Sequence, residues 1–245
     1  MFNTTNYSLI RQSINDFYTS NNPLEPDNFT NSVFTEHKIA TLNIGSTFVF
    51  DQKFLTYPDR KFNVSESKFP SLNVNYRKTF GSSNPEYNAD LITASLTQDI
   101  KASNYGEFFY NIRGGAFLKN KNIAFMDNLQ VKGNQMFIVT DNNRRNNFGL
   151  LEYYRFYTNN RYTEAHLEHS FNGYLLRKIP LINKLNFHLV TGIKGLFMWD
   201  KKPYSEYSIG IDNIGFGKWR VLRVDYVKSN FNGVKVDGFL FGLTF

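Results

Sequence analysis

The stretch VDGFLFGLTF, residues 236–245, has a side-chain period of two. Its bulky apolar side chains recur at every second position: Phe239, Phe241, Leu243 and Phe245. Successive side chains of a β-strand point to opposite faces, so this spacing is typical of a strand with one uniformly apolar face. The stretch therefore predicts a β-strand over these ten residues.

The same alternation recurs along most of the chain from residue 38 onward. In SEYSIGIDNI, for example, Ile209 and Ile211 lie on one face and Ser208 lies on the other. Ten segments with this pattern are predicted to be strands: 38–55, 67–80, 89–103, 106–119, 147–159, 161–177, 183–199, 203–214, 219–230 and 236–245. Residues 6–13 and 135–140 are two shorter candidates, so we expect about 10–12 strands.

The composition favours β structure in one domain. The 245 residues include 25 Phe and 15 Tyr, which are residues enriched in strands. Residues 1–37 are largely polar, with Pro23 and Pro26, and are expected to form an N-terminal loop segment. No shift in composition divides the remainder, so residues 38–245 are expected to form one barrel domain.

Charge and motif content exclude several classes of function. The net charge is +7, but the 28 Lys and Arg residues are scattered along the chain, which argues against a nucleic-acid partner. The chain has no cysteine, and it has no P-loop, dinucleotide-binding or G-x-S-x-G motif. We therefore expect no metal and no cofactor.

Two features favour a transmembrane β-barrel. Several predicted strands are about 14–18 residues long, beyond the 5–6 typical of soluble sheets and enough for the 9–11 that cross a bilayer. Tyrosines and tryptophans lie near predicted strand ends, as at membrane interfaces: Tyr57, Tyr105, Tyr157, Tyr162, Trp199, Tyr204 and Trp219. The prediction is an all-β, antiparallel transmembrane barrel with its bulky residues outward. A soluble barrel with those residues inward remains the alternative.

Longer motifs in the second half of the chain resemble a known family. They are KGNQ (132–135), EAHLEHSFNG (164–173), KIPL (178–181), GIDNI (210–214) and RVDYV (223–227). Over roughly residues 105–245, the chain resembles a Bacteroidetes-type outer-membrane barrel domain of unknown function that follows a carboxypeptidase-regulatory-like domain. That family looks distantly related to BamA-type barrels. The resemblance implies a location in the outer membrane of a Gram-negative cell.

The alternation that closes on Phe245 also resembles the C-terminal signature of bacterial outer-membrane barrels. This resemblance implies that Phe239, Phe241, Leu243 and Phe245 form an assembly signal, recognised by the barrel-assembly machinery. The regulatory-like domain and a signal peptide are missing from the sequence, and ten strands are fewer than a BamA-type barrel has. We therefore expect the C-terminal part of a larger barrel, with a complete ten-stranded barrel as the alternative.

Ionisable residues on the polar face of the predicted strands form the candidate site. Eight are expected to line the barrel interior: Glu164, His166, Glu168, Lys194, Glu206, Asp212, Arg223 and Asp225. In EAHLEH, two carboxylates beside an imidazole share one strand face and could bind a divalent metal or act as acid and base. The favoured interpretation is a polar ladder that pairs with Arg155, Arg223 or Lys194, because burying unpaired charge is costly.

The KGNQ motif, Lys132, Gly133, Asn134 and Gln135, has two interpretations. It is either a loop folded into the barrel interior, as the resemblance implies, or an ordinary glycine turn.

The strand count predicts where the long segment 120–146 lies. Counting the ten predicted strands back from the C terminus places this segment at the same end of the sheet as the C terminus.

These observations predict an integral outer-membrane β-barrel without enzymatic activity, acting as a porin-like channel or in translocation or assembly. Its expected partners are outer-membrane lipid and the barrel-assembly machinery. Two rival functions remain. One is an outer-membrane hydrolase that uses Glu164, His166 and Glu168, and the other is a soluble β-barrel that binds an apolar ligand.

Overall fold

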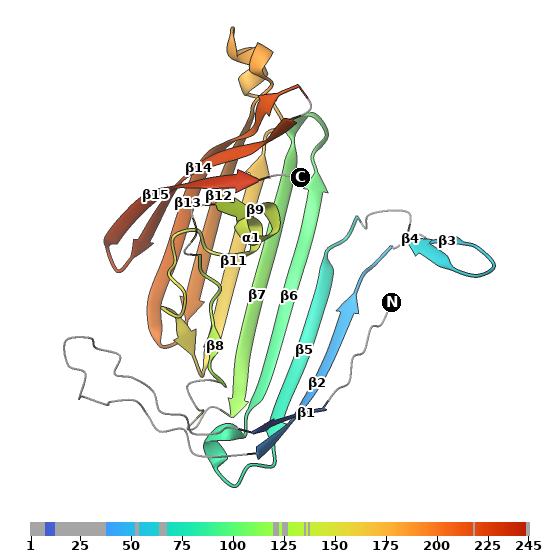
Figure 1. The fold of residues 1–245 in the computed structure, drawn as a ribbon, viewed down its shortest axis with the longest axis vertical. Coiled ribbons are helices and arrows are strands. Elements are labelled where there is room, and N and C mark those ends of the chain that lie inside the picture. Colours follow the sequence, from blue (N-terminus) through green and yellow to red (C-terminus); the bar gives the residue numbers. More distant parts are fainter. Residues whose placement is uncertain are drawn as a thin grey trace.

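The computed structural model describes residues 8–12, 38–51, 54–63, 68–119, 123, 127–134, 136, 138–217 and 219–243. Their main feature is one sheet of eleven strands (Figure 1). In spatial order these are β1 (Ser8–Gln12), β2 (Lys38–Phe48), β5 (Ser71–Phe80), β6 (Asp90–Lys101), β7 (Glu107–Lys119), β11 (Arg161–Ser170), β12 (His188–Met198), β13 (Lys201–Phe216), β14 (Trp219–Phe231), β15 (Val234–Leu243) and β9 (Ile138–Thr140). The prediction of an all-β fold is confirmed.

Short elements complete the described part of the chain. Two small sheets pair β3 (Phe54–Thr56) with β4 (Lys61–Asn63), and β8 (Leu129–Gln130) with β10 (Tyr157–Thr158). The helical elements are α1 (Asp141–Asn146) and the 3-10 turns η1 (Pro85–Tyr87), η2 (Ser103–Tyr105), η4 (Leu176–Lys178) and η5 (Ile182–Leu185). No helix within the described ranges has the length and apolarity needed to cross a membrane.

Nine of the ten predicted long strands are present, with shifted ends, and the two short candidates are confirmed as β1 and β9. The strand predicted over 147–159 is wrong, because only Tyr157 and Thr158 pair as a strand there. Phe148, Leu151 and Phe156 are instead buried in a core cluster against the sheet. Alternating apolar residues can therefore mark a loop that packs on a sheet as well as a strand within it.

The sheet is mixed and open. Neighbouring strands pair antiparallel from β1 through β15, but β15 and β9 pair in parallel, with Phe241 to Leu243 opposite Ile138 to Thr140. The expectation of a purely antiparallel sheet is therefore wrong at this edge. Within the described residues the two edge strands, β1 and β9, do not pair with each other. Part of the edge of β15 is thus covered by a short strand of the same chain.

Because residues 147–159 do not form a strand of the main sheet, the segment that connects β7 to β11 lies at a different end of the sheet from the one predicted. Five strands, β11 to β15, follow the segment that connects β7 to β11, and β7 pairs directly with β11. Because consecutive strands are antiparallel, this segment leaves the sheet at the end opposite to the C-terminal end of β15 (Figure 1). The expectation that it lies at the same end as the C terminus is wrong.

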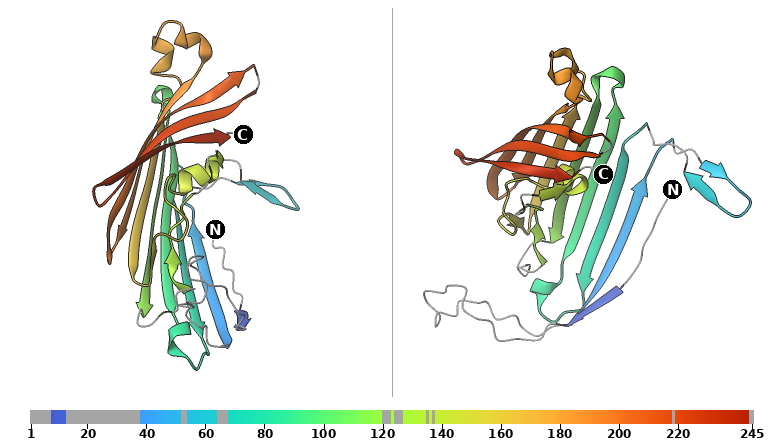
Figure 2. Two further views of the ribbon diagram at one scale, coloured as in Figure 1. Left: turned by 60° about the vertical axis from the view of Figure 1, so that its left-hand side comes forward. Right: turned by 45° about the horizontal axis from the view of Figure 1, so that its top comes forward.

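The sheet curves (Figure 2), and its two faces carry different side chains. On the convex face bulky apolar side chains are exposed, such as Phe197 at 60%, Ile209 at 51% and Phe239 at 58%. Alternate residues on the same strands, such as Glu206 and Leu240, face the concave side and are buried. The core of the described structure therefore lies on the concave side, where the connection between β7 and β11 covers the sheet.

Candidate functional site

The connection between β7 and β11 folds back onto the concave face (Figure 2). We call its residues 127–134 and 138–156 the inner segment. Two of its stretches bond through the backbone: Phe148 N donates to Lys132 O at 3.1 Å. Its apolar side chains join those of β12 and β13 in one buried cluster: Val131, Phe148, Leu151, Phe156, Leu196, Met198 and Tyr204. The inner segment is therefore a packed part of the fold.

The KGNQ motif lies inside this segment. Asn134 N donates to Leu151 O at 2.7 Å, and Asn134 Nδ2 donates to Gly149 O at 3.3 Å. A Cβ atom on Gly133 would lie 2.1 Å from Leu151 O, so only glycine lets the two backbone stretches approach so closely. Gln135 lies outside the described residues. In its described part, residues 132–134, the motif is thus a close contact of two backbone stretches on the concave side of the sheet, and no turn is assigned there.

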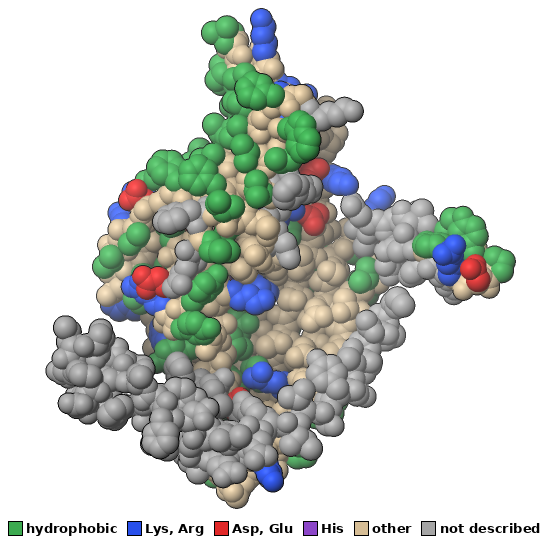
Figure 3. All heavy atoms as spheres, viewed as in Figure 1, with side chains coloured by type: hydrophobic (Ala, Val, Ile, Leu, Met, Phe, Trp, Pro, Cys, Tyr) green, Lys and Arg blue, Asp and Glu red, His purple; other side chains and the backbone are tan. Residues whose placement is uncertain are grey.

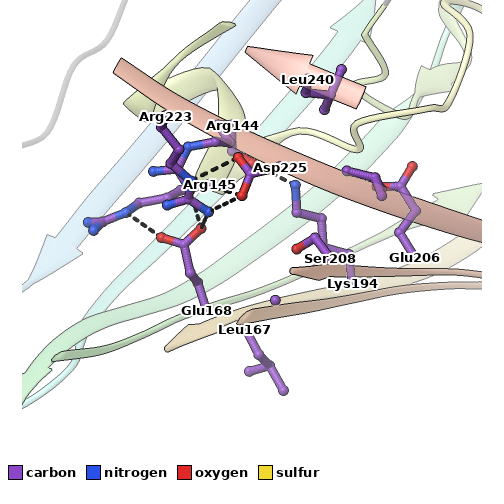
Figure 4. A pocket seen from close by; sticks show the side chains of 12 residues that line it. Arg144, Arg145, Leu167, Glu168, Lys194, Glu206, Ser208, Arg223, Asp225 and Leu240 are labelled. Atoms are coloured by element: carbon purple, nitrogen blue, oxygen red, sulfur yellow. Dashed lines mark hydrogen bonds and ion pairs between the residues drawn. The ribbon is translucent and has the colours of Figure 1, made fainter. Parts of the chain in front are cut away.

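Glu168 on β11 is the centre of a buried cluster of charges (Figure 4). Its Oε2 accepts hydrogen bonds from Arg144 Nη1 and, at 3.1 Å, from Arg223 Nη2. Its Oε1 accepts a hydrogen bond from Arg145 Nε at 3.1 Å. Arg144 and Arg145 belong to α1, whereas Arg223 belongs to β14 and also donates to Asp225 Oδ1 at 2.7 Å. One carboxylate therefore ties the inner segment to the sheet.

Two more charged side chains of the sheet bind the backbone of the inner segment. Glu206 on β13 accepts hydrogen bonds from Gly149 N at 2.7 Å and from Leu150 N at 2.9 Å. Lys194 Nζ on β12 donates to Asn147 O at 2.7 Å. Glu206 is only 1% exposed, so these donors replace the water that its charge would otherwise need.

The EAHLEH stretch makes a second group of contacts. Glu164 Oε1 lies 2.7 Å from Arg113 Nε on β7. His166 Nε2 lies 3.5 Å from Glu164 Oε2, and its ring packs on Phe148 with 4.8 Å between ring centroids. Arg113 also donates to Asn146 O of the inner segment. Glu164 and Glu168 are therefore both paired with arginines, and of the three expected partners, all of which the structure describes, only Arg223 forms an ion pair with a carboxylate of the stretch. No set of three or more His, Cys, Asp or Glu side chains in the described ranges could hold a metal ion.

Seven of the eight predicted interior residues make the contacts described above, and the eighth, Asp212, acts on Arg223 through its charge. Asp212 lies toward the end of β13, opposite His188. Three arginines that complete the cluster were not among the residues predicted from the sequence: Arg113, Arg144 and Arg145. The alternation of β7 places Arg113 on the polar face, but the two arginines of α1 follow no strand period. Arg155, expected as a partner, pairs instead with Glu152 at 3.5 Å on the exposed surface.

The residues of the predicted assembly signal lie along β15. Phe239 and Phe241 project from the convex face and are 58% and 49% exposed. Leu243 ends the strand, and Phe245 lies outside the described residues. Two of the aromatic residues predicted for a membrane interface lie elsewhere: Tyr204 is buried in the core cluster on the concave side, and Tyr162 packs against the same cluster.

Little space remains inside the charged cluster. The cavity beside Glu168, Arg223 and Asp225 has a volume of about 20 Å³, which is room for about one water molecule. A larger cleft of about 210 Å³ lies between the inner segment and the sheet. Its lining is almost entirely polar: Asn73, Thr93, Ala94, Ser95, Arg113, Gln130, Lys132, Tyr162 and Glu164. The charged cluster thus binds a segment of its own chain, and the space beside it is polar.

Replacing Glu206 with glutamine is expected to loosen the inner segment. Glutamine keeps one acceptor oxygen but turns an NH₂ donor toward a backbone N–H, so the free energy of unfolding should fall by about 2–3 kcal/mol. Limited proteolysis with trypsin provides the measurement, because cleavage after Arg144 or Arg145 requires α1 to leave the sheet. The matched control is Glu152→Gln, since Glu152 is exposed on the same segment. Equal cleavage rates in the two variants would contradict the assignment.

Replacing Gly210 with alanine is expected to disturb the charged cluster from the side of the sheet. Gly210 lies opposite Asp225, and a Cβ atom there would lie 2.0 Å from Asp225 Oδ1. Displacing this carboxylate should lower the free energy of unfolding by about 1–3 kcal/mol, measured by denaturant titration. The control is Gly195→Ala on β12, where the nearest atom is 3.4 Å away. The prediction fails if both variants unfold at the same denaturant concentration.

Comparison with known proteins adds one finding. A family model described as the C-terminal domain of a family of unknown function (DUF5686) matches residues 1–211. No curated protein and no solved structure matches the chain. The match includes the first hundred residues, which lie outside the quoted motifs, and it ends within β13. It confirms the resemblance to a domain of unknown function. Because it covers most of the 245 residues, the chain belongs to the DUF5686 C-terminal domain family.

Proposed function

We propose that this domain is the C-terminal part of an outer-membrane β-barrel with a non-enzymatic role in translocation or assembly. The observation that carries the proposal is the division of side chains between the two faces of the sheet. Its exposed convex face is apolar, and its covered concave face holds the charges. A soluble barrel has the reverse arrangement, with apolar residues inside and charges outside.

The convex face supports contact with lipid. Exposed apolar side chains occupy this face from β2 to β15: Ile44, Ile92, Ile112, Ile193, Phe197, Tyr207, Ile209, Ile211, Leu222, Phe239 and Phe241. Soluble monomers rarely expose a continuous apolar patch of this extent. The strands β11 and β12, with 10 and 11 residues, have the length that a tilted strand needs to cross a bilayer.

The concave face supports a wet or protein-filled interior. Under the inner segment it buries the ion pairs of Glu164, Glu168 and Arg223, and the carboxylate of Glu206 with its backbone donors. Figure 3 shows that the uncovered part of this face is mostly polar uncharged side chains and backbone. Alternation of lipid-facing apolar residues with interior polar residues is the pattern of membrane barrels.

The open sheet supports the proposal that this domain completes a larger barrel. Ten curved strands pair in antiparallel succession from β1 to β15. Unpaired strand edges are not tolerated in hydrocarbon, so a membrane-spanning form requires further strands to close the barrel. The description of the matching family as a C-terminal domain is in keeping with this proposal.

The inner segment favours translocation or assembly over an open porin-like channel, because it occupies the concave side. The hydrolase rival is less well supported. Glu164 and Glu168 are both bonded to arginines, and the cavity beside Glu168 has room for about one water. A soluble barrel with an apolar ligand is also less well supported, because the cleft of about 210 Å³ on the concave side is polar.

Replacing Ile193 with lysine separates a membrane barrel from a soluble one. Ile193 is the middle residue of β12 on the convex face and is 51% exposed, and lysine there would cost about 2–4 kcal/mol in a bilayer. In the full-length protein, which supplies the remaining strands, we expect Ile193→Lys to lose the heat-modifiable band on a detergent gel and to leave the detergent-extracted membrane fraction. Glu152→Lys, a charge change on the inner segment, should keep both. If wild type folds without detergent, and Ile193→Lys folds equally well, the membrane proposal is wrong.

Release of the inner segment is expected to raise conductance through the barrel. Wild-type protein in a planar bilayer should pass little current, because the inner segment covers the concave face. Glu206→Gln, which weakens the contacts to Gly149 and Leu150, should raise the open probability of the barrel severalfold. Glu152→Gln should resemble wild type. A large, steady conductance in the wild type would instead favour the porin-like channel.

A further inference from the structure

The connection between β11 and β12 projects beyond one end of the sheet (Figure 1, orange). We call residues 171–187 the tip. It is formed by the turns η4 and η5, although the sequence predicts that strands extend into it from both sides. Its exposed apolar side chains are Leu175, Ile179, Leu181 and Leu185. Figure 3 shows hydrophobic side chains over this projection, with Lys or Arg side chains at its extremity.

The tip is joined to the sheet by specific hydrogen bonds. Asn213 Nδ2 on β13 donates to Asn186 O at 2.7 Å. Arg220 Nη1 on β14 donates to Leu185 O at 2.5 Å. Within the tip, Arg177 Nη2 donates to Asn186 Oδ1 at 2.8 Å. The exposed leucines and isoleucine are therefore held in place by the fold.

Exposed aromatic side chains lie beside the tip at the same end of the sheet. Tyr105, in the turn before β7, packs edge-on against Tyr174 of the tip with 5.1 Å between ring centroids. Phe216 and Trp219, at the turn between β13 and β14, are 91% and 81% exposed. Tyrosine and tryptophan in such positions are typical of the interface between a membrane and water.

The tip has a basic charge. Arg177, Lys178 and Lys184 are exposed, and residues 171–187 contain no Asp or Glu. Lys178 Nζ lies 4.0 Å from the centre of the Tyr174 ring. The acidic side chains Glu107 and Asp212 lie near this end, but within the strands β7 and β13. Exposed apolar side chains beside basic ones are the chemistry that binds an anionic lipid surface.

Leu181 adds an independent observation. Its φ of +74° and ψ of −45° lie in a region that bulky residues rarely adopt. Its side chain is 81% exposed, so no burial in the described structure offsets this strained backbone. Strained backbone positions cluster at functional sites such as ligand clamps, so this exposed leucine is a candidate contact residue.

The lengths of the flanking strands place the tip at the level of lipid headgroups. β11 and β12 have 10 and 11 residues, about the 9–11 that cross the hydrocarbon core. The tip follows directly after Ser170 and ends directly before His188. Its apolar and basic side chains would therefore begin where the hydrocarbon of the bilayer ends.

We propose that the tip is an interfacial anchor that binds anionic phospholipid in the leaflet at this end of the barrel. Ile179 and Leu181 enter the region just below the headgroups, and Lys178 and Lys184 contact lipid phosphates. Tyr105 and Trp219 lie at the same level and widen the contact. This inference rests on the proposed function, because it requires a bilayer around the convex face.

Fluorescent probes test this inference, because the chain has no cysteine of its own. Leu181→Cys and Ile193→Cys are each labelled with an NBD fluorophore in the full-length protein, with any cysteine outside this domain replaced by serine, reconstituted in phosphatidylcholine vesicles with or without phosphatidylglycerol. Spin-labelled phosphatidylglycerol should quench the probe at position 181 at about 25-fold lower concentration than spin-labelled phosphatidylcholine, since Lys178 and Lys184 near an anionic surface contribute about fivefold each. The probe at position 193, in the middle of β12, should be quenched by deeply placed spin labels on either lipid.

Charge reversals provide the matched comparison. The pair Lys178→Glu with Lys184→Glu should remove the preference for the anionic lipid at position 181. The pair Lys228→Glu with Lys235→Glu makes the same charge change near the opposite end of the sheet, where both lysines are exposed, and should keep it.

Each outcome separates the two proposals. If the probe at position 193 is quenched and the probe at 181 is not, the anchor is wrong while the membrane barrel stands, and the tip would then face a water-soluble partner. Equal quenching at 181 by the two lipids, or no effect of Lys178→Glu with Lys184→Glu, also overturns the anchor. An unquenched probe at position 193 overturns the membrane barrel itself.

Discussion

Charge that is buried on the concave face must be matched by opposite charge or by backbone dipoles, and the rest of the structure depends on this constraint. Glu206 and Arg223 are 1% and 3% exposed, so neither is solvated by bulk water. The sheet supplies part of the compensation, as in the pair of Arg223 with Asp225. The inner segment supplies the remainder, through the arginines of α1 and the backbone N–H groups that follow it. The inner segment and the sheet therefore stabilise each other.

This constraint also links the interior to the edge of the sheet. Along the chain, β9 on the edge of β15 is followed directly by α1, which binds Glu168, and then by Gly149, which binds Glu206. About ten residues thus connect the edge contact to both carboxylates. A change that releases α1 from the charges would also weaken the hold of β9 on β15. In the proposed barrel, the covered interior and the covered edge are two consequences of one set of contacts.

Most of the fold could be predicted from side-chain alternation, because a half-covered sheet imposes that pattern on every strand. The alternation located nine long strands and placed Glu164, Glu168 and Arg223 on a shared face. It failed over 147–159, since Phe148 and Leu151 are buried by packing on the sheet and not by membership of it. It also missed Arg144 and Arg145, because α1 has only six residues and no strand period.

The sequence by itself determined that the chain is all-β and that one face of each strand is bulky and apolar while the other is polar. Local side-chain order is enough for this, because the period of a strand does not depend on what lies nearby. Only the tertiary structure decided that the apolar face is convex and exposed, that the inner segment covers the charges, and that β9 pairs with β15. Those features join residues far apart in the chain, such as Arg144 with Arg223 through Glu168. The curvature of the sheet and its long-range strand pairing bring such residues together, and neither can be predicted from the local alternation of side chains.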